Sequence, residues 1–291
     1  MTPADVARGI LVAILWGLAF VATRIGLDSF APAQLAALRF LIASVPALVL
    51  PRPPIRWPLL IATGLTLYAG QFLFQFFGIA AGMPPGLAAL VVQTQALFTV
   101  VFASVVLGER PTPRQIAGLV IAFGGLVVIA TTTGRDLTAA GFALTLGSAV
   151  SWGVGNIFVK RLGVTAQLDL MVWLGLVVPL PALAISAIVD GPAALASAAT
   201  TATAAGWLAA LYLGALATVL AYTIWGGLLR RHPAAAVAPF ALLVPIVGAL
   251  GSAIVFGERF GPLRVLGMAC VLAGLGVIVL PVLRFRSQRI A

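Results

Sequence analysis

Residues 57–108 read WPLLIATGLTLYAGQFLFQFFGIAAGMPPGLAALVVQTQALFTVVFASVVLG, and none of these 52 positions is Asp, Glu, Lys or Arg. A helix needs about 20 mainly apolar residues to cross the ~30 Å hydrocarbon core of a bilayer. The stretch is therefore long enough for two crossings. Gly82, Met83 and Pro84-Pro85 supply turn residues between them. The sequence thus predicts two neighbouring membrane spans joined by a short turn.

The rest of the chain has the same character. Of the 291 residues, 62% are hydrophobic and only 8% are charged, whereas soluble domains average about 25% charged residues. Further apolar stretches predict an all-α membrane protein with ten transmembrane helices. The predicted spans are 6–26, 33–51, 57–81, 84–107, 113–133, 139–159, 170–189, 204–229, 234–256 and 263–283. The Ala/Thr-rich segment 191–203 is predicted to be a loop.

The basic residues predict the orientation of these spans. If the amino terminus lies inside, the inner side collects Arg8, Arg52, Arg56, Arg110, Arg114, Lys160, Arg161, Arg230, Arg231, Arg284, Arg286 and Arg289. The outer side collects Arg24, Arg135, Arg259 and Arg264. Because Lys and Arg are enriched in cytoplasmic loops, both termini are expected in the cytoplasm and the protein in a bacterial inner membrane. The net charge of +10 does not indicate nucleic acid, because the basic residues are spread along the chain rather than clustered.

Motifs recur between the two halves of the chain. Trp16-Gly17 and Arg24 recur as Trp152-Gly153 and Lys160, 136 positions later. At an offset of 149, Gly108-Glu109-Arg110 recurs as Gly257-Glu258-Arg259, and Pro84, Pro113, Gly118, Gly125 and Leu126 recur as Pro233, Pro262, Gly267, Gly274 and Leu275. We therefore divide the chain into a first repeat, 1–134, with spans one to five, and a second repeat, 135–291, with spans six to ten.

An odd number of spans in each repeat has a consequence for topology. The second repeat is expected to cross the membrane in the opposite sense to the first, with Glu109 inside and Glu258 outside. We expect both glutamates to have structural or gating roles. Inverted repeats are typical of carriers that bind their substrate between the two halves. A duplication kept only for packing would leave the same pattern in the sequence.

These motifs resemble those of the EamA type of the drug/metabolite transporter superfamily. The resemblance is carried by Trp16-Gly17 with a basic residue closing span one, by Leu35-Ala36-Ala37-Leu38-Arg39-Phe40, and by the two Gly-Glu-Arg triplets. It covers nearly the whole chain. It implies ten helices in two inverted five-helix repeats and export of amino acids or other metabolites. The general likeness is to bacterial exporters of aromatic and other amino acids.

The composition provides few residues that could carry out catalysis within the membrane. His232 is the only histidine and Cys270 the only cysteine, so no metal site or nucleophile triad can be assembled. The seven carboxylates, which are Asp5, Asp28, Glu109, Asp136, Asp169, Asp190 and Glu258, fall at span ends or in loops. No glycine-rich phosphate loop is present. The sequence therefore predicts no ATP and no cofactor, and its expected partners are a small-molecule substrate and the lipid bilayer.

Polar and aromatic residues inside the spans form the candidate site. Tyr68, Gln71, Phe72 and Gln75 recur at three- and four-residue spacing and so share one helix face, and glutamine amides will not face lipid. The candidate substrate-binding residues are Trp16, Phe20, Tyr68, Gln71, Phe72, Gln75, Gln93, Thr94, Trp152, Asn156, Tyr222 and Trp225. Aromatic walls with amide groups would suit neutral amino acids, aromatic ones included. Hydrogen bonding and packing between helices would account for the same residues without a substrate.

Arg39 is the one ionised residue clearly within a span. It could bind a substrate carboxylate, or it could pair with backbone carbonyls and hold spans together, and we assign it a structural or gating role. In span nine, Pro239 and Pro245 are expected to free backbone carbonyls and to bend the helix. The alternatives to amino-acid export are export of hydrophobic drugs or nucleoside-like compounds, and a membrane scaffold without transport.

Overall fold

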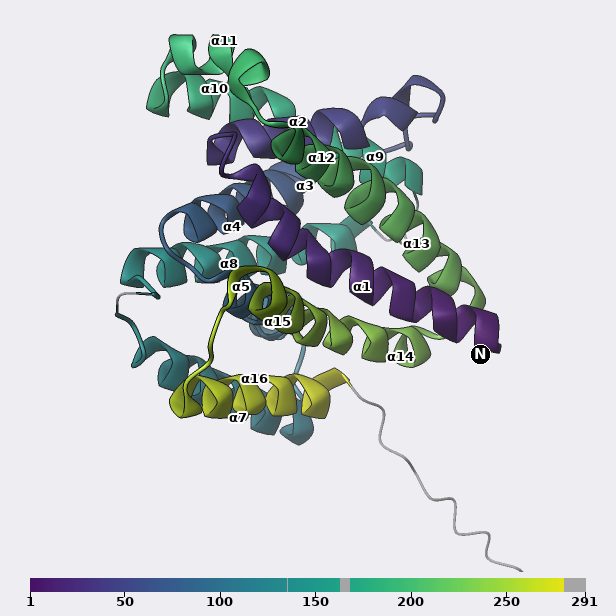
Figure 1. Cartoon of the computed structure of the whole chain (residues 1–291). Helices are drawn as coiled ribbons and strands as arrows, with labels where there is room; N and C mark the ends of the chain where they lie inside the picture. Colours follow the sequence, from purple (N-terminus) through teal and green to yellow (C-terminus); the bar gives the residue numbers. More distant parts are fainter. Residues whose placement is uncertain (135, 163–167, 280–291) are drawn as a thin grey trace, which may run out of the picture.

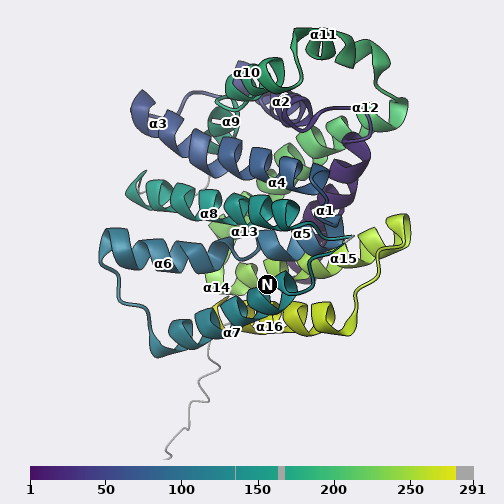
Figure 2. The same cartoon turned by 90° about the vertical axis from the view of Figure 1, so that its left-hand side faces the viewer.

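Helices make up every regular element of the computed structural model over the residues that it describes, which are 1–134, 136–162 and 168–279. The elements of the first half are α1 (Pro3–Gly26), α2 (Pro32–Ala43), η1 (Val45–Leu48), α3 (Trp57–Gly64), η2 (Leu65–Gly70), α4 (Gln71–Ala80), α5 (Pro85–Val92), α6 (Gln95–Leu107) and α7 (Pro113–Ala130). Those of the second half are α8 (Ala139–Leu162), α9 (Leu168–Gly175), α10 (Pro179–Val189), α11 (Pro192–Thr201), α12 (Ala204–Leu211), η3 (Tyr212–Leu220), α13 (Ala221–Arg231), α14 (Ala234–Val237), η4 (Ala238–Leu242), α15 (Leu243–Phe256) and α16 (Pro262–Val279). Figures 1 and 2 show α7 and α16 side by side at one edge of the bundle, with α10 and α11 at the opposite edge.

Nine helical stretches of the described chain are long and apolar enough to cross a bilayer. They are Pro3–Gly26, Trp57–Ala80, Pro85–Leu107, Pro113–Ala130, Ala139–Leu162, Leu168–Val189, Ala204–Arg231, Ala238–Phe256 and Pro262–Val279. Each lies on a predicted span, although positions 280–283 of the last prediction fall outside the described residues. At the second predicted span, 33–51, the helix is shorter. There α2 ends at Ala43 and η1 follows, because Pro46 has no N–H with which to continue the α-helical hydrogen bonds of α2.

The prediction of a loop over 191–203 is wrong, since α11 is a helix from Pro192 to Thr201. Proline fits the first position of a helix, and alanine has the highest helix propensity. None of the residues of α11 is buried, so the helix has no apolar face that a search for spans would detect. The next helix, α12, begins at Ala204, where the following span was predicted to start.

Large apolar side chains cover the outside of the bundle. Ile188 and Ile254 are each 83% exposed, and Val105 and Leu180 are each 79% exposed. Such side chains would be costly in water, but the hydrocarbon of a bilayer covers them without penalty. Inside the bundle, one buried apolar cluster joins α2, α4 and α9, and a second joins α5, α7 and α16. The chain is therefore a multi-pass membrane protein.

Glycines bring α7 and α16 into main-chain contact. A Cβ atom added at Gly118 would lie 2.7 Å from the carbonyl oxygen of Gly274, and one added at Gly125 would lie 2.7 Å from the carbonyl oxygen of Gly267. The two helices therefore cross in opposite directions with their backbones touching (Figure 1). Small residues permit this close approach of membrane helices.

Four more contacts between the halves also depend on glycines. An added Cβ atom would lie 2.9 Å from the Leu174 carbonyl oxygen at Gly64, 2.6 Å from Ile42 Cβ at Gly214, 2.6 Å from Val247 Cβ at Gly17 and 2.8 Å from Phe98 Cβ at Gly153. Each contact joins a helix of residues 1–134 to a helix of the later residues. The halves consequently pack on one another through small residues, which is how helices associate where lipid competes with apolar side chains.

The two Gly-Glu-Arg triplets lie in different surroundings. Both carboxylate oxygens of Glu109 lie 2.9 Å from Lys160 Nζ, and both side chains are well exposed. By contrast, Glu258 Oε2 accepts hydrogen bonds from the Gly86 backbone N–H at 3.0 Å and from the Ser252 hydroxyl. Burial raises the pKa of the Glu258 carboxyl above its usual range. Glu258 thus joins the end of α15 to the start of α5.

Candidate functional site

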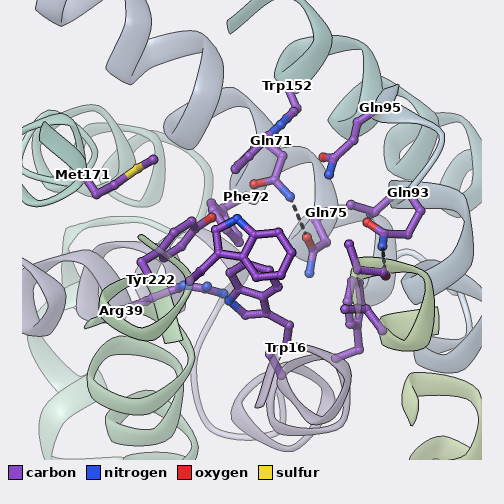
Figure 3. Close-up of a pocket in the computed structure, with 16 residues that line it drawn as sticks. Trp16, Arg39, Gln71, Phe72, Gln75, Gln93, Gln95, Trp152, Met171 and Tyr222 are labelled. Atoms are coloured by element: carbon purple, nitrogen blue, oxygen red, sulfur yellow. Dashed lines mark hydrogen bonds between the residues drawn. The ribbon is translucent and has the colours of Figure 1, made fainter. Parts of the chain in front are cut away.

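A cavity of about 280 Å³ lies among helices of both halves (Figure 3). Its lining residues are Trp16, Ala19, Phe20, Arg39, Gln71, Phe72, Gln75, Val92, Gln93, Gln95, Trp152, Met171, Tyr222, Trp225, Ala241 and Val244. Pockets for drug-sized ligands usually measure about 300–1,000 Å³. The cavity therefore has room for one small molecule.

Helices are interrupted where they meet the cavity. In the fourth span α5 ends at Val92 and α6 begins at Gln95. In the ninth span the 3₁₀ segment η4 precedes α15, so the helix changes its geometry between Pro239 and Pro245. Irregular backbone at membrane depth is tolerated where it lines a cavity, and broken helices are typical of the binding sites of carriers.

Gln93 links the two interruptions. Pro245 has no N–H, so the carbonyl of Ala241, four residues earlier, lacks the hydrogen bond that a regular α-helix would give it. The side-chain amide of Gln93 donates to this carbonyl at 2.7 Å. A polar side chain of the first half therefore replaces the hydrogen bond that a proline of the second half removes.

We expect Gln93→Leu to destabilise the folded protein, because the carbonyl of Ala241 would lose the side-chain hydrogen bond that links the two halves. A hydrogen bond contributes about 0.5–1.5 kcal/mol, and thermal unfolding in detergent would register its loss as a lower melting temperature. Gln95→Leu is the matched control. The Gln95 Oε1 atom is buried without a partner among the described residues, so its removal breaks no hydrogen bond. Equal losses in the two variants would contradict the role of Gln93.

Widened helical turns precede two of the lining segments. The π-helical segment η2 ends at Gly70, directly before Gln71, and the π-helical segment η3 ends at Leu220, two residues before Tyr222. A π-helical turn inserts an extra residue and so rotates the helix that follows it. These segments set the directions in which Gln71 and Tyr222 meet the cavity.

Aromatic rings form much of the wall. The Trp16 ring centroid lies 5.2 Å from that of Tyr222 and 5.1 Å from that of Trp225. The Trp16 indole N–H donates to the Ala217 carbonyl at 3.0 Å, which fixes the ring in place. Trp152 faces this group from α8 in Figure 3. Rings held in this way offer flat apolar surfaces and a negative π face to a ligand.

Amide groups supply the polar part of the wall. The Gln71 side-chain amide donates to Gln75 Oε1 at 3.0 Å. The Oε1 atoms of Gln71 and Gln95 are buried and accept no hydrogen bond from any described residue. A buried acceptor without a donor is costly, so either glutamine side chain would be stabilised by turning towards a bound molecule that can donate.

Arg39 enters the cavity from α2. It is 3% exposed, and its Nε donates to Thr218 Oγ1 at 3.1 Å. The guanidinium carbon lies 4.0 Å from the centroid of the Phe72 ring. Figure 3 shows the side chain reaching into the cavity beside Tyr222. Arg39 was assigned a structural or gating role from the sequence, and the structure places it both between helices and on the cavity wall.

Nine of the twelve candidate substrate-binding residues line the cavity, and three do not. Tyr68 is fully buried behind the wall and donates to Met171 Sδ. The Thr94 hydroxyl donates to the Val91 carbonyl, and the Asn156 amide donates to Thr99 Oγ1 at 2.9 Å. These three side chains contact neighbouring protein groups instead of the cavity.

The structure adds lining residues that the candidate set lacked, chiefly Gln95, Met171 and Arg39. Gln95 follows Gln93 by two residues, and at that spacing two side chains of a regular helix would point in different directions. The break after Val92 brings both side chains to the cavity. Ala19, Val92, Ala241 and Val244 have side chains like any others of an apolar span, so no sequence signal distinguishes them.

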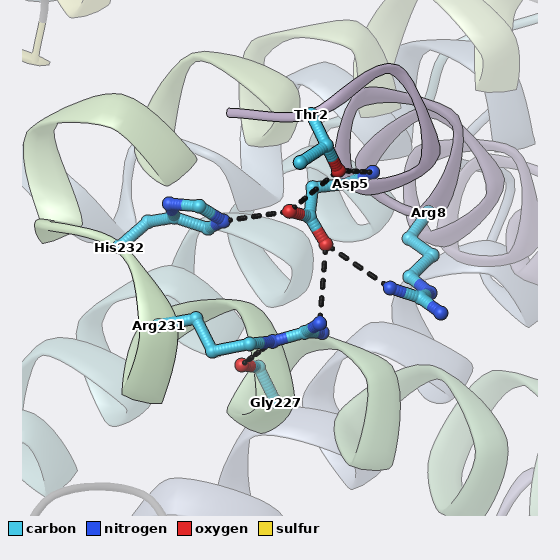
Figure 4. Close-up of polar contacts among 6 residues, drawn as sticks. All are labelled: Thr2, Asp5, Arg8, Gly227, Arg231 and His232. Atoms are coloured by element: carbon cyan, nitrogen blue, oxygen red, sulfur yellow. Dashed lines mark hydrogen bonds and ion pairs between the residues drawn. The ribbon is translucent and has the colours of Figure 1, made fainter.

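A second polar cluster ties the start of α1 to the end of α13 (Figure 4). The Asp5 carboxylate is the centre of this cluster. It accepts from Arg8 at 3.1 Å and from Thr2 at 2.9 Å, and it lies 3.3 Å from Arg231 and 2.9 Å from His232. None of these side chains lines the cavity, so the cluster holds two helix ends together outside the site.

The fold and the site define a membrane transporter, because a multi-pass bundle encloses a small polar and aromatic cavity at interrupted helices. The chain belongs to the EamA-like transporter family, whose pattern matches residues 6–131 and again residues 139–280. This membership confirms the resemblance noted in the sequence. It also identifies the protein as a transporter rather than an enzyme.

Relatives with assigned names support the same class. The chain is 39% identical over 298 residues to a probable amino-acid metabolite efflux pump of Salmonella typhimurium, covering 100% of this chain and 99% of that protein. It is 39% identical to a probable amino-acid metabolite efflux pump of Escherichia coli, with 96% of each chain covered. It is 33% identical to a probable terminal-alkyne amino-acid exporter of Streptantibioticus cattleyicolor, covering 92% of this chain and 91% of that protein. A solved crystal structure with 21% identity superposes with a TM-score of 0.63 over 96% of this chain and 97% of the other, which supports the fold alone.

Proposed function

We propose that the protein exports amino acids or related small metabolites through the cavity between its two halves. The observation that supports this proposal most strongly is the cavity itself, in which aromatic rings, glutamine side chains and one arginine surround about 280 Å³ of space. Aromatic and other neutral amino acids suit this combination, because rings hold the side chain and polar groups hold its charged ends. The names of the relatives as amino-acid exporters support the same substrate class.

The runner-up substrates are hydrophobic drugs and nucleoside-like compounds. The cavity volume lies just below the ~300–1,000 Å³ that drug-sized ligands occupy, which favours a smaller molecule. A scaffold without transport would not explain why the Oε1 atoms of Gln71 and Gln95 are buried without a hydrogen-bond donor. We therefore rank both alternatives below amino-acid export.

We also propose that residues 1–134 and 135–291 form two inverted repeats of five spans each. The glycine contacts of α7 and α16 support this arrangement. Gly118 and Gly125 have Gly267 and Gly274 as their counterparts, and the contacts run crosswise, from Gly118 to Gly274 and from Gly125 to Gly267. Two units related by a two-fold axis make reciprocal contacts of this kind.

The other glycine contacts add to this support. The added Cβ atom of Gly64 would meet Leu174, and that of Gly214 would meet the carbonyl oxygen of Arg39 at 2.8 Å. Gly64 and Gly214 are 150 positions apart, and Arg39 and Leu174 are 135 positions apart. These two offsets lie within one position of the offsets of 149 and 136 between the repeated motifs, as a duplicated five-span unit predicts. In this arrangement both termini lie in the cytoplasm of a bacterial inner-membrane protein. Arg135, Arg284, Arg286 and Arg289, which entered the charge count, lie outside the described residues.

An efflux assay with labelled amino acids tests the proposed function. Cells that carry the protein are expected to release neutral amino acids faster than cells without it. Trp152→Ala and Gln75→Leu should lower this rate roughly tenfold or more, because both residues line the cavity. Trp207→Ala is the matched control, since Trp207 packs against Phe30 away from the cavity. If no amino acid leaves faster than in control cells, the proposal is wrong.

A further inference from the structure

Two arginines are buried among the described residues, and they differ in what balances their charge. Arg264 is 6% exposed, and its guanidinium donates to both oxygens of Asp136, with 2.9 Å between Nη2 and Oδ1. The same interaction holds the pKa of the Asp136 carboxyl below its usual range. Arg39 is 3% exposed and forms an ion pair with none of the seven carboxylates, all of which are described.

The Arg39 guanidinium has donors to spare. An arginine carries five N–H donors, and here only Nε has a protein acceptor, the hydroxyl of Thr218 at 3.1 Å. No described residue accepts a hydrogen bond from the two terminal amino groups. The Phe72 ring covers one face of the guanidinium, with 4.0 Å from the ring centroid to the guanidinium carbon. A buried cation without a counter-ion is strongly unfavourable, and the cavity that Arg39 lines is the route by which an anion can reach it.

We propose that the counter-ion of Arg39 is the carboxylate of the transported molecule. This inference rests on the proposed function, because it assigns one part of the substrate to one residue of the same cavity. The planar guanidinium fits a carboxylate through two parallel N–H···O bonds. Arg39 is the only basic residue among the lining residues. It therefore matches a substrate with a single carboxylate, whereas a phosphate or a dicarboxylate would bring a second negative charge without a partner.

The same cavity offers acceptors for the other end of an amino acid. No carboxylate lines the cavity, so a substrate ammonium group has no anionic partner there. The side chains of Gln71 and Gln95 line the cavity and carry Oε1 atoms without a donor, so they can turn to accept its N–H groups. The rings of Trp16 and Trp152 can interact with its charge. A zwitterion satisfies both the arginine and the amide oxygens, whereas a simple amine would leave Arg39 unpaired.

Binding of matched acids and amides to the purified full-length protein tests this assignment. The probe pairs are acetate and acetamide, 4-methylpentanoate and its amide, and 3-phenylpropanoate and its amide. The fluorescence of Trp16, Trp152 and Trp225, which line the cavity, reports binding. We expect at least one acid to bind roughly tenfold or more tightly than its amide, as a charge-assisted hydrogen bond implies.

Variants assign the preference to Arg39. In Arg39→Gln the acid and its amide should bind with nearly equal affinity. Arg39→Lys should keep part of the preference, because the charge remains but the planar pair of donors is lost. Arg264→Gln is the matched control, since it removes the other buried arginine. It should lower thermal stability and leave the preference intact.

Two outcomes would overturn the inference. The first is a wild-type protein that binds no probe acid more tightly than its amide, a result that needs no variant to fold. The second is an Arg39→Gln protein that keeps the full preference. The efflux assay and this binding assay test different statements, so either one can give a negative result without the other. A preference that depends on Arg39 without amino-acid efflux would refute the proposed function alone, and efflux without the preference would refute the assignment of Arg39 alone.

Discussion

Gly125→Leu is expected to prevent α7 and α16 from packing and to lower sharply the yield and melting temperature of the folded protein. An added Cβ would lie 2.7 Å from the carbonyl oxygen of Gly267 and 2.8 Å from the backbone nitrogen of Val271. Both are main-chain atoms of α16, so no side-chain rotation relieves the clash. Overpacking of a core typically costs about 1–3 kcal/mol. Because the clash here is with backbone atoms, we expect a loss of stability at or above the upper end of that range. Thermal unfolding and size-exclusion chromatography in detergent would measure the loss.

Gly124→Leu provides a control one position away in the same helix. Gly124 is exposed, and a Cβ added there would have no atom within 4 Å. Because glycine costs a helix about 0.8–1.0 kcal/mol relative to alanine, this variant should be as stable as the wild type or more stable. Similar melting temperatures for the two leucine variants would show that the crossing of α7 and α16 does not depend on close backbone contact.

Glu258→Ala is expected to open the side of the protein where α5 begins and α15 ends. The carboxylate joins these helices through the Gly86 N–H and the Ser252 hydroxyl. Each hydrogen bond contributes about 0.5–1.5 kcal/mol, so the loss of both should raise the population of the open state roughly tenfold. In a Cys270→Ser background, Leu87→Cys places a thiol at a fully buried position of α5. Its labelling by a membrane-impermeant maleimide should accelerate by that factor when Glu258 is removed.

Two variants control this experiment. Glu109→Ala changes the corresponding glutamate of the other Gly-Glu-Arg triplet, whose partner is the exposed Lys160, and labelling at position 87 should not change.

Glu258→Gln keeps an oxygen acceptor for Gly86 but cannot ionise. Burial raises the pKa of Glu258, so the folded state favours the protonated carboxyl. Its contribution to stability is present in acid and decreases as the pH rises through the raised pKa. The wild type should therefore lose stability relative to Glu258→Gln as the pH increases, and the opposite slope would contradict the arrangement.

Much of the site could be predicted from helix faces. The residues that were predicted to line the cavity and do not line it share a common cause. Spacing indicates which side of a helix turns towards protein, but it does not indicate whether that side meets a cavity or another helix. Asn156 lies four residues after Trp152 on α8, yet its amide meets Thr99 of α6 while Trp152 meets the cavity. Tyr68 lies three residues before Gln71, but the π-helical turn of η2 separates them and changes their relative direction.

The amino-acid sequence alone indicates that the chain lies in a membrane, where most spans begin and end, and that its motifs occur twice. Hydropathy and the positions of proline and glycine are local properties, so they can be read along the chain without any knowledge of its packing. Which polar groups find partners became known from the three-dimensional structure. It joined Gln93 to the carbonyl of Ala241 and Glu258 to the backbone of Gly86, and it left Arg39 without a carboxylate. These relations depend on distances between residues more than a hundred positions apart, which the packing of the two halves sets and no local pattern records.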